Sequence, residues 1–341
     1  MPVVQAEFAE DLAVRILRGV GAPEPAARCV AESLVQANLT GHDSHGVRKL
    51  SRYVDDIRAG MLHPDAEPTV VRQLAGAAVI DGGSGFGHLA ARAGADLVSD
   101  LATEAGLACV ALRRCHHTGR IGNWSERIAA RGLIAIIAGG EGHKAYYIVA
   151  PHGGAEGALA TNPFSCAVPR SDGRPPVLLD YATSVVSIGK LQAAMDAGLP
   201  APADSFIDAD GNPSARLADF FDGGLLLPFG GYKGYALAVV AELLAVGLGG
   251  GDRVPETDAA SALMMIAIQP DLLRPREEFD EFVDATEARL KAVAPRTPGG
   301  TVLLPGEPEQ QARSRNADGV SIPDVTWAAL HRLADEVAAG G

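Results

Sequence analysis

The sequence has few of the residues that build disulfide frameworks or sulfur-bound metal sites. Its 341 residues include four cysteines, which stand apart from one another with no CxxC pair. We therefore expect neither a disulfide scaffold nor a thiolate zinc site, and a reducing cytoplasm fits this usage best. The four are Cys29, Cys109, Cys115 and Cys166.

Long apolar runs and an excess of basic charge are also missing. No uninterrupted apolar stretch reaches about 18 residues, and the first residues lack the pattern of a targeting peptide. The formal net charge of −13 argues against a nucleic-acid partner or a polybasic membrane patch. We expect a soluble cytoplasmic protein that binds small molecules and other subunits, without nucleic acid or membrane.

The common nucleotide-binding and nucleophile motifs are missing as well. The loop 82–87 reads GxGxG instead of GxGxxG, so a standard Rossmann domain is not predicted. Gly189 and Lys190 are followed by leucine, which rules out a P-loop, and Ser84 lacks the final glycine of GxSxG. Phosphoryl transfer by a P-loop and acyl transfer by a nucleophile elbow therefore lose support.

Strand and helix patterns alternate through the middle of the chain, which indicates an α/β fold. Strands are expected at 77–81, 107–112, 133–138, 165–169, 177–180 and 262–268. Helices are expected at 8–19, 23–39, 44–60, 88–105, 122–131, 185–197, 234–248, 276–293 and 325–337. The helix 234–248 is apolar nearly all round and should be buried, while 199–217 is expected to be a turn-rich surface excursion.

The expected elements divide the chain into two domains. Residues 1–70 form a helical domain, which residues 300–341 are expected to join. Residues 71–299 form the α/β domain. The separate helical part gives the α/β class some α+β character.

The segment 41–53, GHDSHGVRKLSRY, gathers more reactive and charged groups than any neighbour of equal length. On a helix that starts at Ser44, residues His45, Lys49 and Arg52 would share one face. That face would place a proton carrier beside two cations that can hold a carboxylate. Redox chemistry on a 2-hydroxy acid needs both, because the hydroxyl proton leaves as the hydride does. A solvated helix face is the alternative.

Two histidines follow an expected strand, at a place where ligands gather in α/β sheets. His116 and His117 are adjacent on an extended chain, so at most one should face the same pocket as His45. A loop histidine bonded to backbone is the alternative. A metal site that includes His42 has no supporting spacing, so we predict no metal.

Two glycine-containing segments stand at expected helix starts. LPFGGYKGY sets Tyr232 and Lys233 where backbone N–H groups and an ammonium could hold a phosphate. LPGE sets Gly306 and Glu307 where a carboxylate could accept hydrogen bonds from ribose or nicotinamide. A turn or a helix cap is the alternative for each.

Several longer motifs follow one another along the chain. They are DSHGV (43–47), DGGSGFG (81–87), HHTGRIG (116–122), APHGG (150–154), ATNPFS (160–165), LDYATS (179–184), IDADGNP (207–213), LPFGGYKGY (227–235) and LPGE (304–307). In these motifs and their order the sequence resembles the malate/L-lactate dehydrogenase family of the type without a Rossmann fold. That family includes ureidoglycolate dehydrogenase, diketogulonate reductase, sulfolactate dehydrogenase and piperideine-2-carboxylate reductase.

The resemblance implies an enzyme that transfers hydride between NAD or NADP and C2 of a small 2-hydroxy or 2-oxo carboxylic acid. It also implies a homodimer, with a helical domain set against a non-Rossmann cofactor domain that contains a mixed sheet. A cyclic imino-acid reductase on the same fold is the alternative. A nucleotide-binding protein without turnover is a remote alternative.

The resemblance also implies roles for particular residues. His45 matches the proton donor and acceptor, with Ser44 beside it, and His117 matches the second active-site histidine. The candidate substrate-binding residues are Arg48, Lys49 and Arg52. The residues that match cofactor contacts are Asp180, Ala182, Thr183, Ser184, Tyr232, Lys233, Gly306 and Glu307.

Two departures from the family pattern affect the expected site. Members usually read SHGVxRL, so Lys49 stands where an arginine is usual, and an ammonium cannot form the bidentate fork that guanidinium forms with a carboxylate. After the strand ending near residue 138, a Thr-Asn or Asn-Ser pair is replaced by GGEGHKAYY. There Glu141, His143 or Lys144 are expected to supply the polar contacts.

Overall fold

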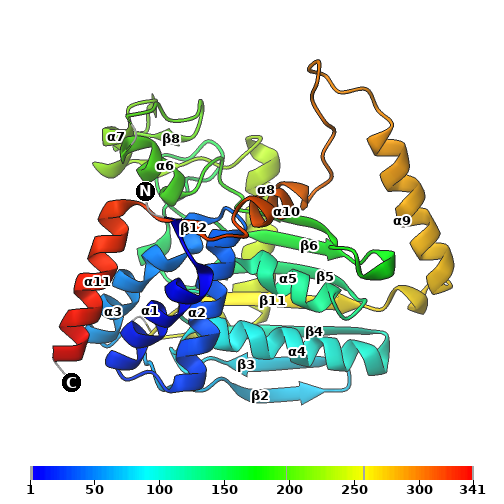
Figure 1. Cartoon of the computed structure of the whole chain (residues 1–341), viewed down its shortest axis with the longest axis horizontal. Coiled ribbons are helices and arrows are strands. Elements are labelled where there is room, and N and C mark those ends of the chain that lie inside the picture. The colour runs from blue at the N-terminus through cyan, green and yellow to red at the C-terminus, as the bar shows by residue number, and fades with distance from the viewer. Residues whose placement is uncertain (1–2, 197, 256–257, 340–341) are drawn as a thin grey trace.

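The computed structural model describes residues 3–196, 198–255 and 258–339, so the last position of the expected helix 185–197 lies outside the described residues. The helices in Figure 1 are α1 (Ala6–Gly19), α2 (Glu24–Leu39), α3 (Leu50–Arg58), α4 (Gly87–Ala105), α5 (Ile121–Ala129), α6 (Ile188–Asp196), α7 (Leu217–Phe221), α8 (Tyr232–Glu242), α9 (Arg276–Lys291), α10 (Glu307–Arg315) and α11 (Asp324–Ala339). The longer strands are β2 (Thr69–Leu74), β3 (Ala77–Asp81), β4 (Leu107–Cys115), β5 (Ile134–Glu141), β6 (Phe164–Val168), β7 (Val177–Tyr181) and β11 (Ser261–Ile268). The two-residue strands are β1 (Val3–Val4), β8 (Phe206–Ile207), β9 (Pro213–Ser214), β10 (Leu225–Leu226) and β12 (Val320–Ser321). Across the described part of the chain, no helix combines the length and apolar character that a bilayer crossing requires.

A seven-stranded mixed sheet with the order β2-β3-β4-β11-β5-β6-β7 forms the centre of the α/β part. β3 and β4 run parallel, and the other neighbouring strands run antiparallel. Helices α4 and α5 pack on one face, and α8 with the π-helical turn Leu243–Leu248 packs on the other. Because both faces are covered, β4, β5 and β11 are nearly continuous apolar runs. The expected α/β class is confirmed.

Helices from both ends of the chain pack together beside the sheet (Figure 1). α1, α2, α3 and α11 share one apolar core, in which Leu34, Tyr53 and Leu330 are fully buried. β1 pairs with β12, so the two end segments are also joined through backbone hydrogen bonds. The domain boundaries near residues 70 and 300 stay a prediction.

The third helix is shorter than expected. Two 3-10 turns, η1 (Asp43–His45) and η2 (Val47–Lys49), precede α3. Gly46 separates them in an extended conformation, and a Cβ there would stand 2.2 Å from Asn38 Oδ1. That oxygen accepts a hydrogen bond from Val47 N at 2.9 Å, so α2 stabilises the break in the helix.

Two expectations about burial are wrong. α8 and the π-helical turn bury only the side that meets the sheet, so Val240, Leu243 and Leu248 remain 50%, 63% and 70% exposed. The segment 199–217 is not only a surface excursion, because Phe206 packs fully buried in a satellite core. In both cases the apolar composition was clear, but the position of the packing partner was not.

The two edges of the sheet have different surroundings. β2, which the sequence pattern did not reveal, is exposed along its whole length, and its register with β3 is irregular between Val70 and Arg72. At the other edge, Leu178 N on β7 donates to Pro305 O at 3.1 Å. The ordered sheet therefore ends at an irregular strand on one side and at a covering loop on the other.

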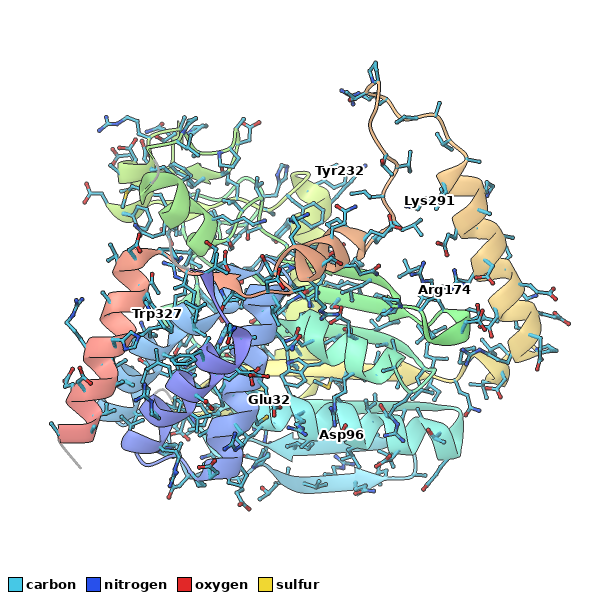
Figure 2. All side chains as sticks on the ribbon, in the orientation of Figure 1. Glu32, Asp96, Arg174, Tyr232, Lys291 and Trp327 are labelled. Carbon is cyan, nitrogen blue, oxygen red and sulfur yellow. The ribbon has the colours of Figure 1, made fainter. Side chains whose placement is uncertain are left out.

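Helix α9 stands away from the body of the molecule and has no buried residue (Figures 1 and 2). Ion pairs attach it to the β6–β7 connection: Arg174 pairs with Asp284, and Arg170 Nη1 lies 3.0 Å from Glu287 Oε2. Phe282 on this helix remains 62% exposed because no described element covers that side.

Candidate active site

One buried side chain of α2 fixes the turn that carries the expected acid/base histidine. Asn38 Nδ2 donates to Asp43 Oδ1 at 2.6 Å, and Asn38 Oδ1 accepts from Val47 N at 2.9 Å. On its outer side the turn meets α6, where a Cβ on Gly189 would stand 2.4 Å from Ser44 Cβ. The turn is therefore held from two sides.

A hydrogen-bonded chain of three aromatic side chains forms the centre of the site. His45 Nδ1 lies 3.1 Å from His117 Nε2, and His117 Nδ1 lies 2.6 Å from Tyr53 Oη. The two imidazole rings stack, with 5.2 Å between centroids and 7° between planes. Because Tyr53 is buried in the helical core, it orients His117, and His117 orients His45.

The neighbouring histidine faces a different partner. His116 Nε2 lies 2.9 Å from Asp56 Oδ2, so only one of the two adjacent histidines meets His45, as the extended chain predicts. Asp56 also accepts hydrogen bonds from Arg52 Nε at 2.7 Å. Within the described residues, no group of three or more His, Cys, Asp or Glu side chains is arranged to hold a metal ion.

Three residues of this cluster were not revealed by the sequence patterns. Tyr53 and Asp56 continue the spacing of Lys49 and Arg52, at i+4 and i+7 from the lysine, so a longer helical pattern would have found them. His88 on α4 is fully buried, and neither of its ring nitrogens has a hydrogen-bond partner among the described residues. Its ring centroid lies 5.8 Å from that of Tyr53.

Burial keeps the central histidines uncharged. Burial, and after it the Lys49 ammonium, lowers the pKa of His45 to about 3. The same two causes lower the pKa of His117 well below its ordinary value. Burial also lowers the pKa of Lys49, followed by repulsion from Arg48 and Arg52. A bound anion beside Lys49 would relieve this excess of positive charge.

The three candidate substrate-binding cations lie in different environments. Arg48 is exposed, and Arg52 is bound by Asp56. Lys49 is half-buried, and no carboxylate of the described chain lies within ion-pair distance of its Nζ. Lys49 is therefore the cation best placed to receive a carboxylate from a ligand.

The candidate cofactor residues of the LDYATS motif lie at the end of edge strand β7. Asp180 belongs to the strand, and half-buried Ala182 follows it. The hydroxyl groups of Thr183 and Ser184 both donate to backbone carbonyl oxygens at 2.9 Å. These two hydroxyls therefore shape the loop.

Both other candidate cofactor segments lie against β7 or the loop after it. Phe229 N donates to Thr183 O at 2.9 Å, which brings the start of α8, with the exposed Tyr232 and Lys233, beside the loop. At the start of α10, Gly306 packs so closely on β7 that a Cβ would stand 3.0 Å from a side chain of that strand. The fold thus gathers the three segments along one edge of the sheet.

Glu307 is engaged within its own loop. Its carboxylate pairs with Lys291 and accepts a hydrogen bond from Leu304 N at 2.7 Å. Burial alone would raise the pKa of Glu307, but these two bonds outweigh it and lower the pKa. A hydrogen bond from a ribose or nicotinamide group would have to compete with both.

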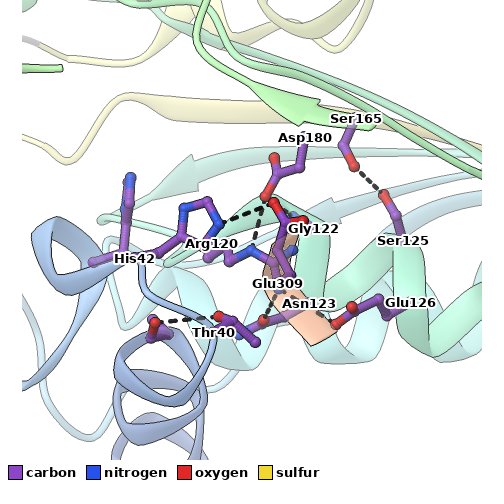
Figure 3. A network of polar contacts seen from close by, with 12 residues as sticks. Thr40, His42, Arg120, Gly122, Asn123, Ser125, Glu126, Ser165, Asp180 and Glu309 are labelled. Atoms are coloured by element: carbon purple, nitrogen blue, oxygen red, sulfur yellow. Dashed lines mark hydrogen bonds and ion pairs between the residues drawn. The ribbon is translucent and has the colours of Figure 1, made fainter. Parts of the chain in front are cut away.

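Arg120 joins the loop after β4 to the end of β7, as Figure 3 shows. Its buried guanidinium has Nε 2.9 Å from Asp180 Oδ2, and its Nη1 lies 3.0 Å from Asn123 Oδ1 and 3.3 Å from Glu126 Oε2. Burial raises the pKa of Asp180, and the charge of Arg120 acts in the opposite direction. The motif HHTGRIG contains Arg120 but gave no sign that it is buried.

The segment that replaces the usual Thr-Asn pair places an acidic group at the end of β5. Ser261 Oγ donates to Glu141 Oε1 at 2.7 Å, whereas Oε2 is buried without a partner among the described residues. Burial, with a contribution from Glu242, raises the pKa of Glu141 to about 7. His143 bonds a backbone carbonyl at 3.2 Å, and Lys144 is exposed.

Known proteins match this chain over nearly its whole length. The family whose sequence profile matches residues 4–331 is described as malate/L-lactate dehydrogenase. The chain is 35% identical to the L-lactate dehydrogenase of Cupriavidus necator, over 96% of each chain. It is 32% identical to the Delta(1)-pyrroline-2-carboxylate/Delta(1)-piperideine-2-carboxylate reductase of Pseudomonas syringae pv. tomato, over 95% of this chain and 94% of that one.

Comparison with solved structures points to the same family as the sequence matches. The solved sulfolactate dehydrogenase of Methanocaldococcus jannaschii superposes with a TM-score of 0.88 and 29% sequence identity, and the match covers 99% of this chain and 98% of that one. The profile spans almost all of the sequence, and the shared fold includes both the helical layer and the mixed sheet. This chain therefore belongs to the malate/L-lactate dehydrogenase family.

Proposed function

We propose that this protein is an NAD(P)-dependent oxidoreductase that transfers hydride to and from C2 of a small 2-hydroxy or 2-oxo acid. The observation that carries the proposal is the bonded chain of His45, His117 and Tyr53 beside Lys49, which has no ion-pair partner among the described residues. A neutral imidazole can take the proton of a substrate hydroxyl, and an ammonium can hold the carboxylate on the next carbon. The relatives named as lactate and sulfolactate dehydrogenases support this substrate class.

The edge beside β7 suits a dinucleotide. Gly230 and Gly231 both have positive φ ahead of α8, and a Cβ on Gly230 would meet open space. At this turn the first backbone N–H groups of α8 and the ammonium of Lys233 can bind phosphate. When bound, the nicotinamide supplies or accepts the hydride. The residues proposed to line the rest of the cofactor site are Asp180, Ala182, Thr183, Ser184, Tyr232, Gly306 and Glu307.

His45 carries the substrate proton in the proposed reaction. Neutral His45 accepts the hydroxyl proton during oxidation, and the protonated ring donates it to the C2 oxygen during reduction. A tyrosine hydroxyl can either donate or accept a hydrogen bond, so the contact between Tyr53 and His117 can persist whichever His117 nitrogen carries the proton. Burial raises the pKa of Tyr53, which keeps this end of the chain uncharged.

The two directions of the reaction should respond differently to pH. The ratio kcat/KM reports ionisations of the free enzyme, in which the pKa of His45 is about 3. Above that value the ring is neutral, so kcat/KM for oxidation should stay flat between about pH 5 and pH 9. Reduction needs a proton on His45, so its kcat/KM should fall about tenfold per pH unit. A decrease in kcat/KM for oxidation at pH values below the ordinary pKa of histidine would show that His45 becomes protonated there, and would contradict the prediction.

The activity itself can be tested by following nicotinamide absorbance with NADH and NADPH in parallel. The acceptors would be pyruvate, oxaloacetate, phenylpyruvate, 2-oxoglutarate and piperideine-2-carboxylate. Oxidation of either cofactor by a 2-oxo acid would support the proposal and identify the cofactor preference. Binding of cofactor with no turnover of any acceptor would contradict it.

A cyclic imino-acid reductase is the second candidate, and similarity to the Pseudomonas syringae reductase favours it. A cyclic imine with a 2-carboxylate presents the same carboxylate beside an sp2 carbon, so His45 and Lys49 could serve it unchanged. Turnover of piperideine-2-carboxylate without turnover of any 2-oxo acid would select this candidate.

We also propose that the protein is a cytoplasmic homodimer. The exposed apolar side of α8 and its π-helical turn, with Val240, Leu243 and Leu248, is a surface that a second copy could cover. The cysteines are free, which agrees with a reducing compartment. Sedimentation equilibrium should give twice the mass of the chain, and a monomer at micromolar concentration would contradict the dimer.

A further inference from the structure

The side of α3 that faces the histidines carries a defined set of charges. Lys49 directly precedes α3 in a helical conformation, and Arg52, Tyr53 and Asp56 follow it at i+3, i+4 and i+7, so the four share one side. Tyr53 and Asp56 each bond one of the two adjacent histidines after β4. This side of α3 therefore forms one wall of the proposed substrate site.

Arg52 on this wall already has a partner, although its side chain is 60% exposed. Its Nε lies 2.7 Å from both carboxylate oxygens of Asp56, which is 3% exposed and is also bonded by His116. Burial alone would raise the pKa of Asp56, but the bonds from His116 and Arg52 outweigh it and lower the pKa. Asp56 is thus an anion at neutral pH, and Arg52 is held as its partner.

Lys49 is left as the uncompensated cation of the wall. Its Nζ has no carboxylate within ion-pair distance among the described residues, and its charge reaches both His45 and His117. Arg48 is exposed and projects about 120° away from Lys49 in the 3-10 turn η2, so it does not extend the wall. One carboxylate is enough to balance this side of the site.

A second acidic group, Glu141, acts on the same neighbour as Arg52 and Asp56. Glu141 stands at the end of β5 with one buried oxygen unpartnered. Burial is the main cause of the raised pKa of Tyr146. The charges of Glu141, Arg52 and Asp56 also affect this pKa, so all three lie within electrostatic reach of Tyr146. A second anionic group on a substrate that reached Tyr146 would meet the negative charges of Asp56 and Glu141, which repel it.

We infer, on the basis of the proposed function, that the site selects 2-hydroxy and 2-oxo acids with a single carboxylate over those with a second anionic group. Asp56 sets this selection by cancelling the charge of Arg52, which could otherwise receive a second carboxylate. Glu141 reinforces it by adding a second negative charge within reach of Tyr146. The substrate class is a monocarboxylate whose remaining part is uncharged.

A matched pair of substrates tests this selection. Malate differs from 2-hydroxybutanoate in having a carboxylate where the latter has its terminal methyl group. Racemic acids should be compared at about pH 8, where Glu141, with its pKa of about 7, is ionised. We expect kcat/KM for 2-hydroxybutanoate to exceed that for malate by roughly tenfold or more. An equal or higher value for malate would overturn the inference but leave the proposed function standing. Failure of both acids together with every acceptor of the activity test would overturn both.

Two variants test the assigned residues. Asp56→Asn frees Arg52 and should raise the ratio of malate to 2-hydroxybutanoate turnover several-fold, and a second change, Arg52→Gln, should abolish that gain. If Asp56→Asn does not fold, Glu141→Gln should still shift the ratio toward malate, because it removes the second negative charge near Tyr146. A general loss of packing would lower kcat/KM for both acids and leave their ratio unchanged, so an unchanged ratio in every folded variant overturns the inference.

Discussion

Replacement of His45 by alanine is expected to lower kcat by about 100-fold to 10,000-fold in both directions, the usual range for loss of a general acid or base. The loss follows from geometry: His45 completes the chain that begins at buried Tyr53, and no other described histidine is bonded to His117. Protein stability should change little, because the turn is held by Asn38 and the histidine ring is only half-buried. Steady-state kinetics with a 2-oxo acid and with its 2-hydroxy partner measure the effect.

The matched control is His331→Ala. His331 is an exposed histidine on α11 whose ring contacts Trp327, outside the catalytic cluster. It should keep the activity of the unmodified protein. Added imidazole should restore part of the activity of His45→Ala, since the missing side chain leaves room at a half-buried position. Full turnover by His45→Ala without imidazole would refute the assignment.

Replacement of Arg120 by methionine is expected to lower the free energy of unfolding by about 3–5 kcal/mol, the cost of leaving a buried ionic partner unpaired. Methionine fills much of the same volume but leaves Asp180 and Glu126 without their shared cation. Asp180 would then lose the interaction that opposes the effect of burial on its pKa. The end of β7 should loosen, which would also weaken cofactor binding.

Urea denaturation of Arg120→Met and Arg131→Met gives a direct comparison. Arg131 also pairs with an aspartate, at 2.7 Å from Asp100, but their side chains are 39% and 62% exposed. Loss of such a surface pair should cost less than about 1 kcal/mol. Equal losses in the two variants would show that burial of Arg120 does not set its contribution.

The sequence predicted best those strands whose composition alone shows whether they are buried. β4, β5 and β11 are apolar on both faces, and they were expected because a strand buried on both sides leaves a short continuous apolar run. β2 gave no such signal, since it is exposed throughout and is held by backbone pairing with β3. The partial exposure of α8 was missed for the opposite reason: its composition shows apolar character but not which side has a partner.

In the candidate site, too, the sequence predicted some residues and missed others. His45 and Lys49 were found because the segment 41–53 concentrates reactive groups at helical spacing, and His117 because it follows an expected strand. Tyr53 and Arg120 were missed, since a buried tyrosine or arginine acquires its role from residues far away in sequence. The break at the start of α3 was missed too, because it depends on the fit between α2 and a glycine.

The two edges of the central sheet also limit how copies of this protein can associate. An exposed edge strand can accept a strand from another molecule and continue into a fibre. Here the register irregularity between Val70 and Arg72 disturbs the free hydrogen-bonding row of β2, and the loop at Pro305 occupies that of β7. Chains should therefore join through side chains on their helices, so even at high concentration the protein is protected against ordered aggregation through its largest sheet.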